Sequence, residues 1–218
     1  MSMNEIIFIL HIFFLITFIS VAAKIGKNAL IGISVIQSII SNLFITKQIT
    51  LFTLCVTTTD AYAISYIVTS NLIQEYFGKN ESKKILNINV LLLFFFCIAS
   101  IIQLSYVPST HDTYQSAFSK ILMPSSRILI SSIVSFYTSQ RIDIELFAVL
   151  RKKFSLKITA ILSMITSQAI DTIMFSYLAL FGIVNSVANI IIVSYSIKII
   201  AIFSLVPLTR LLRKRISN

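Results

Sequence analysis

Apolar residues fill most of this chain in long runs, and short polar or basic breaks interrupt them. Seven runs can be delimited, at residues 6–23, 29–46, 49–74, 88–107, 121–150, 158–181 and 184–208. Each is close to the roughly 20 apolar residues that a helix needs to cross the hydrocarbon core of a bilayer. Because a helix satisfies its own backbone hydrogen bonds in lipid, each run predicts a transmembrane helix. Gly182 predicts where the sixth helix ends.

The composition supports an integral membrane protein. The 218 residues are 56% hydrophobic and only 12% charged, whereas a soluble domain has roughly 25% charged residues. No polar stretch is long enough to fold separately, so residues 1–218 are expected to form one transmembrane domain. We predict an all-α bundle of six to seven transmembrane helices. The count stays open because only Lys47 and Gln48 separate the second and third runs, and one segment could be re-entrant.

The basic residues predict an orientation. If the breaks alternate between the two sides, thirteen Lys and Arg residues fall on one side and only Lys47 and Lys120 on the other. The positive-inside rule puts the richer side in the cytoplasm, with the N-terminus outside and the C-terminus inside. A net charge of +10 arranged in this way indicates topology rather than nucleic-acid binding. The thirteen are Lys24, Lys27, Lys79, Lys83, Lys84, Arg151, Lys152, Lys153, Lys157, Arg210, Arg213, Lys214 and Arg215.

The first run could be mistaken for a secretory signal because it ends in Ala22 and Ala23. The preceding MSMNE, however, has no Lys or Arg, and a signal peptide normally begins with positive charge. We therefore expect a retained first span.

A near-repeat supplies the main candidate chemistry. In TSQAIDTIMF, residues 166–175, a helix would place Gln168, Asp171 and Phe175 on one face. An ionisable group inside a membrane-length apolar run is costly and therefore indicates function. Twenty-eight residues earlier TSQRIDIELF repeats this spacing with Gln140, Asp143 and Phe147.

Depth along the helices predicts a partner for Asp171. At about 1.5 Å per residue, Asp171 and Lys198 both lie roughly 20 Å above the basic side, whereas Asp143 lies roughly 9 Å lower than Asp171. An ion pair between Asp171 and Lys198 is expected, because a buried lysine needs a carboxylate or water. Arg127, near the outer end of its span, is a second charge partner or else extends outward to the interface.

Several of these polar residues also have a structural interpretation. Asp143 would be interfacial if its span ended near Gln140, and Gln168 could hydrogen-bond between helices. Asp60, after three threonines, fits a helix N-cap as well as a ligand. Glu75, with Asn71 one turn deeper, completes the candidate set at the basic end of the third run.

These motifs resemble the queuosine precursor transporter family. EYFGK at residues 75–79 is similar to its E-x-x-G-K signature, and residues 125–147 and 167–175 resemble its two Q-x-x-D segments. Lys198 and Pro207 fall where its last span has Lys and Pro. The sequence departs from the family at Asn71, where an acidic residue is common. The resemblance extends from the third run onward.

The resemblance implies import of queuine or of 7-cyano- or 7-aminomethyl-7-deazaguanine across the bacterial inner (plasma) membrane. It implies a fold like the substrate-binding subunits of vitamin transporters, acting without an ATPase module. Carboxylates can accept from the base amines, amides can donate to its carbonyl, and aromatic rings can stack on it. The substrate-binding candidates are Asp171, Gln168, Asp143, Gln140, Glu75, Asn71, Phe175 and Phe147.

Other functions remain as alternatives. A substrate-binding subunit for a vitamin or another purine-like base could work with a separate ATPase, since this sequence has no P-loop of its own. An intramembrane enzyme is disfavoured because HExxH, GxSxG and GxGD motifs are absent. The Cys and His residues have no metal-ligand spacing, and no cofactor is expected. The oligomeric state stays open, with a homodimer as one option.

Overall fold

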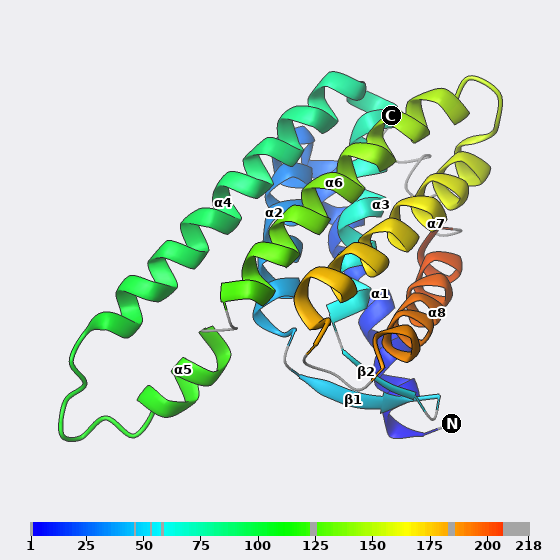
Figure 1. Cartoon of the computed structure of the whole chain (residues 1–218). Helices are drawn as coiled ribbons and strands as arrows, with labels where there is room; N and C mark the ends of the chain where they lie inside the picture. Colours follow the sequence, from blue (N-terminus) through cyan, green and yellow to red (C-terminus); the bar gives the residue numbers. More distant parts are fainter. Residues whose placement is uncertain are drawn as a thin grey trace.

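The computed structural model describes residues 2–45, 47–52, 54–57, 59–122, 126–182 and 186–206. A helical bundle and one small β-hairpin make up this part of the chain (Figure 1). The elements are α1 (Met3–Ile25), α2 (Lys27–Leu43), β1 (Gln48–Leu51), β2 (Leu54–Thr57), α3 (Thr59–Phe77), α4 (Lys79–Ser105), α5 (Gln115–Leu122), α6 (Ser126–Leu150), α7 (Leu156–Phe175), the π-helical turn η1 (Ser176–Leu180) and α8 (Val187–Leu205).

The all-α architecture agrees with the sequence prediction. Among the described residues, α1–α4 and α6–α8 are seven helices of 17 or more residues. Five helical segments are long and apolar enough to cross a membrane: Met3–Ile25, Lys79–Ser105, Gln115–Leu150, Leu156–Leu180 and Val187–Leu205. The protein is therefore an α-helical, multi-pass membrane bundle, and the sixth predicted helix ends just before Gly182, which has a positive φ of 80°.

Helix α3 forms the centre of the bundle, with the other long helices around it (Figure 1). Fourteen of its 19 residues are buried. Its polar residues face other helices rather than lipid: Ser65 accepts a hydrogen bond from Gln37 of α2 over 2.9 Å, and Gln74 donates to the carbonyl of Ile144 in α6 over 2.8 Å. Such bonds hold helices together in a setting where apolar contact alone does not distinguish protein from lipid.

The predicted third span is wrong over its first ten residues. Residues 48–57 form the β1–β2 hairpin, and the helix begins only at Thr59. The strands pair antiparallel, with Ile49 opposite Val56. This stretch is apolar enough to look like part of a span, but its β-branched residues favour a strand. Phe52, with φ of 50°, begins the tight connection between the strands.

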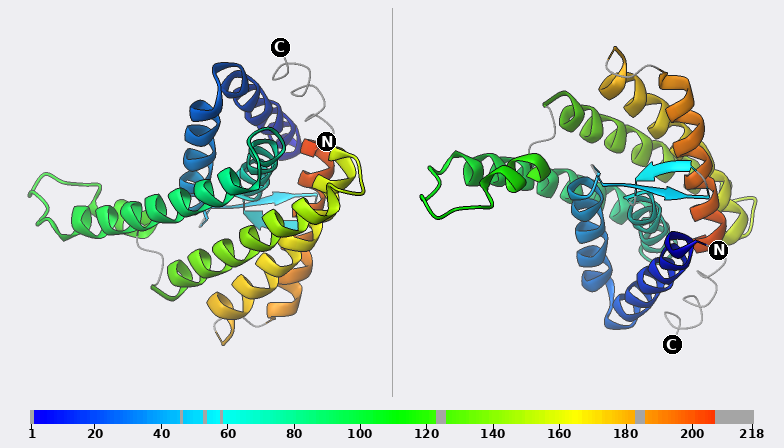
Figure 2. Two further views of the ribbon diagram at one scale, coloured as in Figure 1. Left: turned by 90° about the horizontal axis from the view of Figure 1, so that it is seen from above. Right: turned by 90° about the horizontal axis from the view of Figure 1, so that it is seen from below.

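The hairpin lies across one end of the bundle (Figure 2). Leu51 and Val56 pack with Ile197 of α8, and Phe8 of α1 lies against this cluster. The Asn4 side chain also donates to the carbonyl of Thr50 over 2.9 Å. These contacts tie the hairpin to the first and last helices.

The fifth predicted span coincides with parts of two described helices. Its first residues belong to α5, a short helix that starts inside the predicted polar loop, and α6 begins at Ser126. Residues 207–218 lie outside the described part, and with them the predicted roles of Pro207 and the basic tail.

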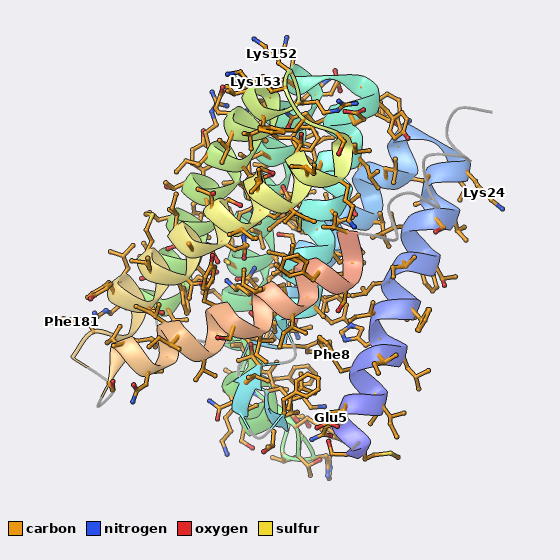
Figure 3. The ribbon with its side chains drawn as sticks, turned by 90° about the vertical axis from the view of Figure 1, so that its right-hand side faces the viewer. Glu5, Phe8, Lys24, Lys152, Lys153 and Phe181 are labelled. Carbon is orange, nitrogen blue, oxygen red and sulfur yellow. The ribbon has the colours of Figure 1, made fainter. Side chains whose placement is uncertain are left out.

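The opposite end of the bundle is basic, as the charge pattern predicts. Lys24, Lys152 and Lys153 gather there, whereas Glu5 and Phe181 lie toward the hairpin end (Figure 3). Ion pairs connect the helix ends on this basic side. The pairs are Lys27–Glu81 at 2.6 Å, Lys83–Glu145 at 2.7 Å, Lys79–Glu145, and Arg151–Glu75 at 2.7 Å.

Candidate functional site

A cavity of about 780 Å³ opens among α2, α3, α6, α7 and α8, next to the hairpin. Its volume falls within the range of about 300–1,000 Å³ that is usual for small-molecule sites. Its wall is mainly apolar, with a few polar groups. The polar and charged residues include Asn42, Gln48, Thr57, Thr59, Asp60, Lys120, Ser132, Asp171, Thr172, Ser176, Asn189, Ser194 and Lys198.

A buried ion pair lies in the cavity wall. Lys198 Nζ donates to Asp171 Oδ2 over 2.8 Å, so the expected contact between these side chains is present. Lys198 comes from α8 and Asp171 from α7, and their side chains are 8% and 21% exposed. The other oxygen of Asp171 accepts from Ser139 of α6 over 3.3 Å. Three helices therefore fix the orientation of one carboxylate.

Asp60 is a second carboxylate in the same wall. It lies in the first turn of α3, and the residue is only 7% exposed. The charges of Lys198 and Asp171 both act on it. The structure thus gives Asp60 a place in the cavity, and it is the second residue of α3 instead of the N-cap.

Two phenylalanines supply flat apolar surface beside these charges. Phe175 ends α7 and Phe136 lies on α6, and both line the cavity. Nearby, Ser132 of α6 donates to Asn42 Oδ1 of α2 over 2.8 Å. This contact joins two helices at the cavity wall and holds the Asn42 amide in place.

A π-helical turn follows Phe175. Ser176 and Leu180 of η1 line the cavity. Arg127 holds the end of this turn, because it donates to the carbonyls of Leu178 and Phe181 over 2.7 and 2.8 Å. Within the described residues Arg127 therefore contacts backbone oxygens instead of a carboxylate, and the predicted charge pairing is not seen. Single π-helical turns occur often at functional sites.

Four of the predicted ligands lie behind the cavity wall in a second polar group, which we call the inner cluster: Asn71, Gln140, Asp143 and Gln168. None is more than 2% exposed, and none lines the cavity. Asp143 Oδ1 accepts from Ser167 Oγ over 3.1 Å, and Asn71 lies against the same carboxylate. Asp143 is thus fully buried within the protein, on a helix that continues to Leu150.

The inner cluster has unused hydrogen-bonding capacity. Within the described part of the chain, the carbonyl oxygens of Gln140 and Gln168 have no hydrogen-bond partner. Leaving a buried polar group unpaired costs about 1–3 kcal/mol. Such groups in one place are typical of a site that pairs with something during function.

The remaining two predicted ligands lie elsewhere. Glu75 forms a two-pronged ion pair with Arg151 at the basic end, and this hydrogen-bonded pair raises the pKa of the Arg151 guanidinium. Phe147 is 1% exposed and belongs to the main apolar core. By its spacing Phe147 shares the helix face of Gln140 and Asp143, but it packs in the apolar core and does not line the cavity.

Comparison with known families decides the wider assignment. A family model described as "Putative vitamin uptake transporter" matches residues 57–212, more than two thirds of the chain. The chain belongs to this family. The matched range begins at the end of β2, so α1 and α2 precede it. Neither the curated proteins nor the solved structures contain a match to the chain.

Membership in the vitamin uptake transporter family gives the helices and the cavity a common interpretation. The apolar helices span a lipid bilayer, and the substrate is a small molecule. Most of the cavity residues named above belong to the matched range, including Asp60, Phe136, Asp171, Phe175 and Lys198. Sequence reasoning missed Phe136, which lies outside the Q-x-x-D spacing on which the candidate set was built.

Proposed function

We propose that this transporter imports queuosine precursors across the bacterial inner membrane, as a secondary-type transporter. The substrates in question are queuine and the 7-cyano- and 7-aminomethyl-7-deazaguanine bases. The observation that carries the proposal is the cavity in which the Asp171–Lys198 pair lies beside Phe175 and Phe136. The resemblance of the two Q-x-x-D segments to the queuosine precursor transporters supports the choice of substrate.

The chemistry of a deazaguanine base fits these groups. Its Watson–Crick edge has adjacent N–H donors, which a carboxylate such as Asp171 can accept. Its carbonyl oxygen needs a hydrogen-bond donor. Lys198, which pairs with Asp171, can serve as that donor. Its flat ring can stack on an aromatic side chain, which contributes roughly 1–3 kcal/mol per base. A ligand lacking these groups would leave buried polar atoms unpaired and would bind less well.

The inner cluster fits a later stage of transport. It lies on the same helices as the cavity wall, α6 and α7, but nearer the basic end. The unpaired amide oxygens of Gln140 and Gln168 offer further partners for the N–H groups of a base. We infer that the base moves from the cavity to Gln140, Asp143, Gln168 and Asn71 when the helices rearrange. Glu75 lies beyond them at the basic end.

The uneven distribution of basic residues between the two ends of the bundle indicates the direction of transport. The cavity lies next to the hairpin, at the end of the bundle opposite Lys24, Lys152 and Lys153 (Figure 3). Under the positive-inside rule the basic end faces the cytoplasm. The cavity then faces outward, as capture of an external substrate requires.

A direct uptake experiment tests the proposal. Cells unable to make queuosine and lacking other importers receive this chain and one precursor at a time, and queuosine in their tRNA is measured. At least one precursor is expected to restore it. If none does so while the protein is present in the membrane, the proposed substrate class is wrong.

The energy source needs a separate test, because a binding subunit with a partner ATPase would pass the first one. ATP is depleted while the proton gradient is maintained, and uptake of the labelled base is followed. Continued uptake is expected for a secondary transporter. Uptake that stops with ATP would favour the binding-subunit alternative.

A further inference from the structure

We propose that Asp60 makes the cavity selective for cationic substrates, that is, for a base with a protonated amine in place of a neutral substituent. This inference rests on the proposed function, since it concerns which precursor is carried. It assigns a specificity role to a residue that lies outside both Q-x-x-D segments.

The first argument is the state of the Asp60 side chain. The residue is more than nine-tenths buried and lines the cavity. Within the described part of the chain its carboxylate has neither a hydrogen bond nor an ion pair. Asp171, in contrast, is already bound by Lys198 and Ser139. A buried carboxylate without a partner is costly, so a cation that reaches it gains a strong interaction.

The second argument is the charge balance of the cavity. Its enclosed wall contains two carboxylates, Asp60 and Asp171, and one ammonium group, Lys198. Lys120 also lines the cavity, but it lies on α5 and is exposed to solvent. Screening by water weakens its influence compared with that of buried charges. The enclosed part therefore has one negative charge in excess.

Helix α3 favours the charged form of Asp60. The residue is in the first turn, where the positive end of the helix dipole stabilises an anion. Within the described part of the helix, only Thr59 precedes Asp60. A place in the first turn of a helix is thus compatible with a ligand role for Asp60.

This charge distinguishes the chemical classes of precursor. An aliphatic amine such as an aminomethyl group is protonated near neutral pH, as the lysine side chain is. Queuine has a secondary amine with the same property. A cyano group is neutral and offers nothing to a carboxylate except through water. With the ring near Phe175, a cationic substituent could reach Asp60, so the aminomethyl base and queuine should be favoured over the cyano base.

The experiment compares uptake of labelled 7-aminomethyl- and 7-cyano-7-deazaguanine by the full chain, by Asp60→Asn and by Asp112→Asn. Asp112 is a matched control, because it lies exposed in the loop before α5 and receives hydrogen bonds from the backbone N–H groups of Tyr114 and Gln115. The unaltered chain and the control should prefer the aminomethyl base. Asp60→Asn should lower that preference at least about tenfold, since the loss of one buried charge contact exceeds 1.4 kcal/mol.

The outcomes separate this inference from the proposed function. Absence of uptake for every precursor would contradict the function itself. Equal uptake of both bases by the unaltered chain, or an unchanged ratio in Asp60→Asn at equal membrane level, would overturn the role of Asp60 and leave the function intact. If Asp60→Asn fails to insert, the N-acetylated aminomethyl base serves instead. It has lost its charge and should compete at least about tenfold less well with the labelled amine, and equal competition would overturn the inference.

Discussion

Ser139 on α6 donates a hydrogen bond to Asp171 on α7 over 3.3 Å, and the relationship is reciprocal. Ser167 on α7 donates to Asp143 on α6 over 3.1 Å. Each copy of the S-Q-x-I-D repeat thus supplies a serine to the aspartate of the other copy. Since the helices run in opposite directions, the two pairs lie four residues apart, or about 6 Å. The near-repeat therefore has a geometric basis, and the two aspartates lie at different depths as expected.

Replacing one serine tests the importance of this reciprocal pairing. Ser167→Ala should lower the free energy of unfolding by about 1–2 kcal/mol, because it removes a donor from a fully buried carboxylate. The loss stays in this range because the Ser167 hydroxyl also reaches the carbonyl of Met164 in its own helix. Thermal unfolding in detergent measures the effect.

A matched control is available for this change. Ser196→Ala removes an exposed serine of α8 that bonds only to the Ile192 carbonyl within its own helix, as far as the described residues show. Its stability should change by less than about 0.5 kcal/mol. Equal losses for Ser167→Ala and Ser196→Ala would mean that the bond between the helices contributes little.

Asp171→Asn is expected to abolish uptake. The change leaves Lys198 without its ion-pair partner and removes the carboxylate proposed to accept the base. The loss should exceed about a hundredfold, corresponding to 2.7 kcal/mol or more. Uptake is normalised to the amount of protein in the membrane. Normal uptake at the native level of expression would contradict the assignment of this residue to the site.

The inner cluster predicts opposite effects on stability and transport. Gln168→Met replaces a buried amide whose carbonyl oxygen is unpaired by an apolar side chain of similar size. We expect it to raise the free energy of unfolding by about 1 kcal/mol, because it removes a buried oxygen that has no hydrogen-bond partner. Uptake should fall, because the proposed path loses a polar contact.

Gln37→Met provides the contrasting control. Gln37 is equally buried, but its amide donates to Ser65 over 2.9 Å. The same substitution should destabilise the protein by about 1–3 kcal/mol, since it leaves the buried Ser65 hydroxyl without its hydrogen-bond partner. If both variants lose stability equally, the Gln168 oxygen has a partner in the folded state, and the argument for an available ligand group fails.

Glu75 and Arg151 offer a test of whether Glu75 acts directly on the substrate. Glu75→Gln should reduce uptake by weakening the paired contact at the basic end. Exchanging the two residues, Glu75→Arg with Arg151→Glu, should restore most of the lost uptake if the pair is structural. A double variant that inserts normally yet stays inactive would instead support the predicted ligand role of Glu75.

Orientation can be checked at the two termini. We expect a reporter joined before residue 1 to be active outside and one joined after residue 218 to be active in the cytoplasm. Seven long helices and a basic end predict opposite sides for the two ends. Cytoplasmic signals from both would contradict the seven-span arrangement.

The sequence predicted the helices well because hydrophobic length is directly visible in it. It also predicted the contact between Asp171 and Lys198, since depth follows from counting residues at a fixed rise. Counting also gives the relative direction around the helix axis, but it does not tell which neighbours a face meets, and Phe147 packs in the apolar core instead of lining the cavity. The hairpin formed by β1 and β2 was not predicted, because an apolar strand has the same composition as part of a transmembrane span.

Contacts between distant parts of the chain were also beyond sequence reasoning. The Asn42–Ser132 bond joins residues 90 positions apart, and although Ser132 lies in the segment 125–147, nothing in the sequence pairs it with Asn42. The role of Asp60 depends on the cavity wall that surrounds it. Only the fold shows that its carboxylate lies near Asp171 and Lys198 instead of merely starting a helix.

The polarity of α3 has a consequence for how the protein enters the membrane. Among the described helices, α3 is at the centre, and it falls outside the segments apolar enough to cross a bilayer independently. The charged residues Asp60 and Glu75 lie in its first and last turns, and buried amides and hydroxyls such as Ser65, Asn71 and Gln74 make its middle polar. Helix α2 emerges from the ribosome before α3 and brings the Gln37 amide that Ser65 needs. Biogenesis of this transporter should therefore depend on the insertion machinery retaining early helices until α3 can join them, so that changes in α2 lower the yield of protein before they affect transport.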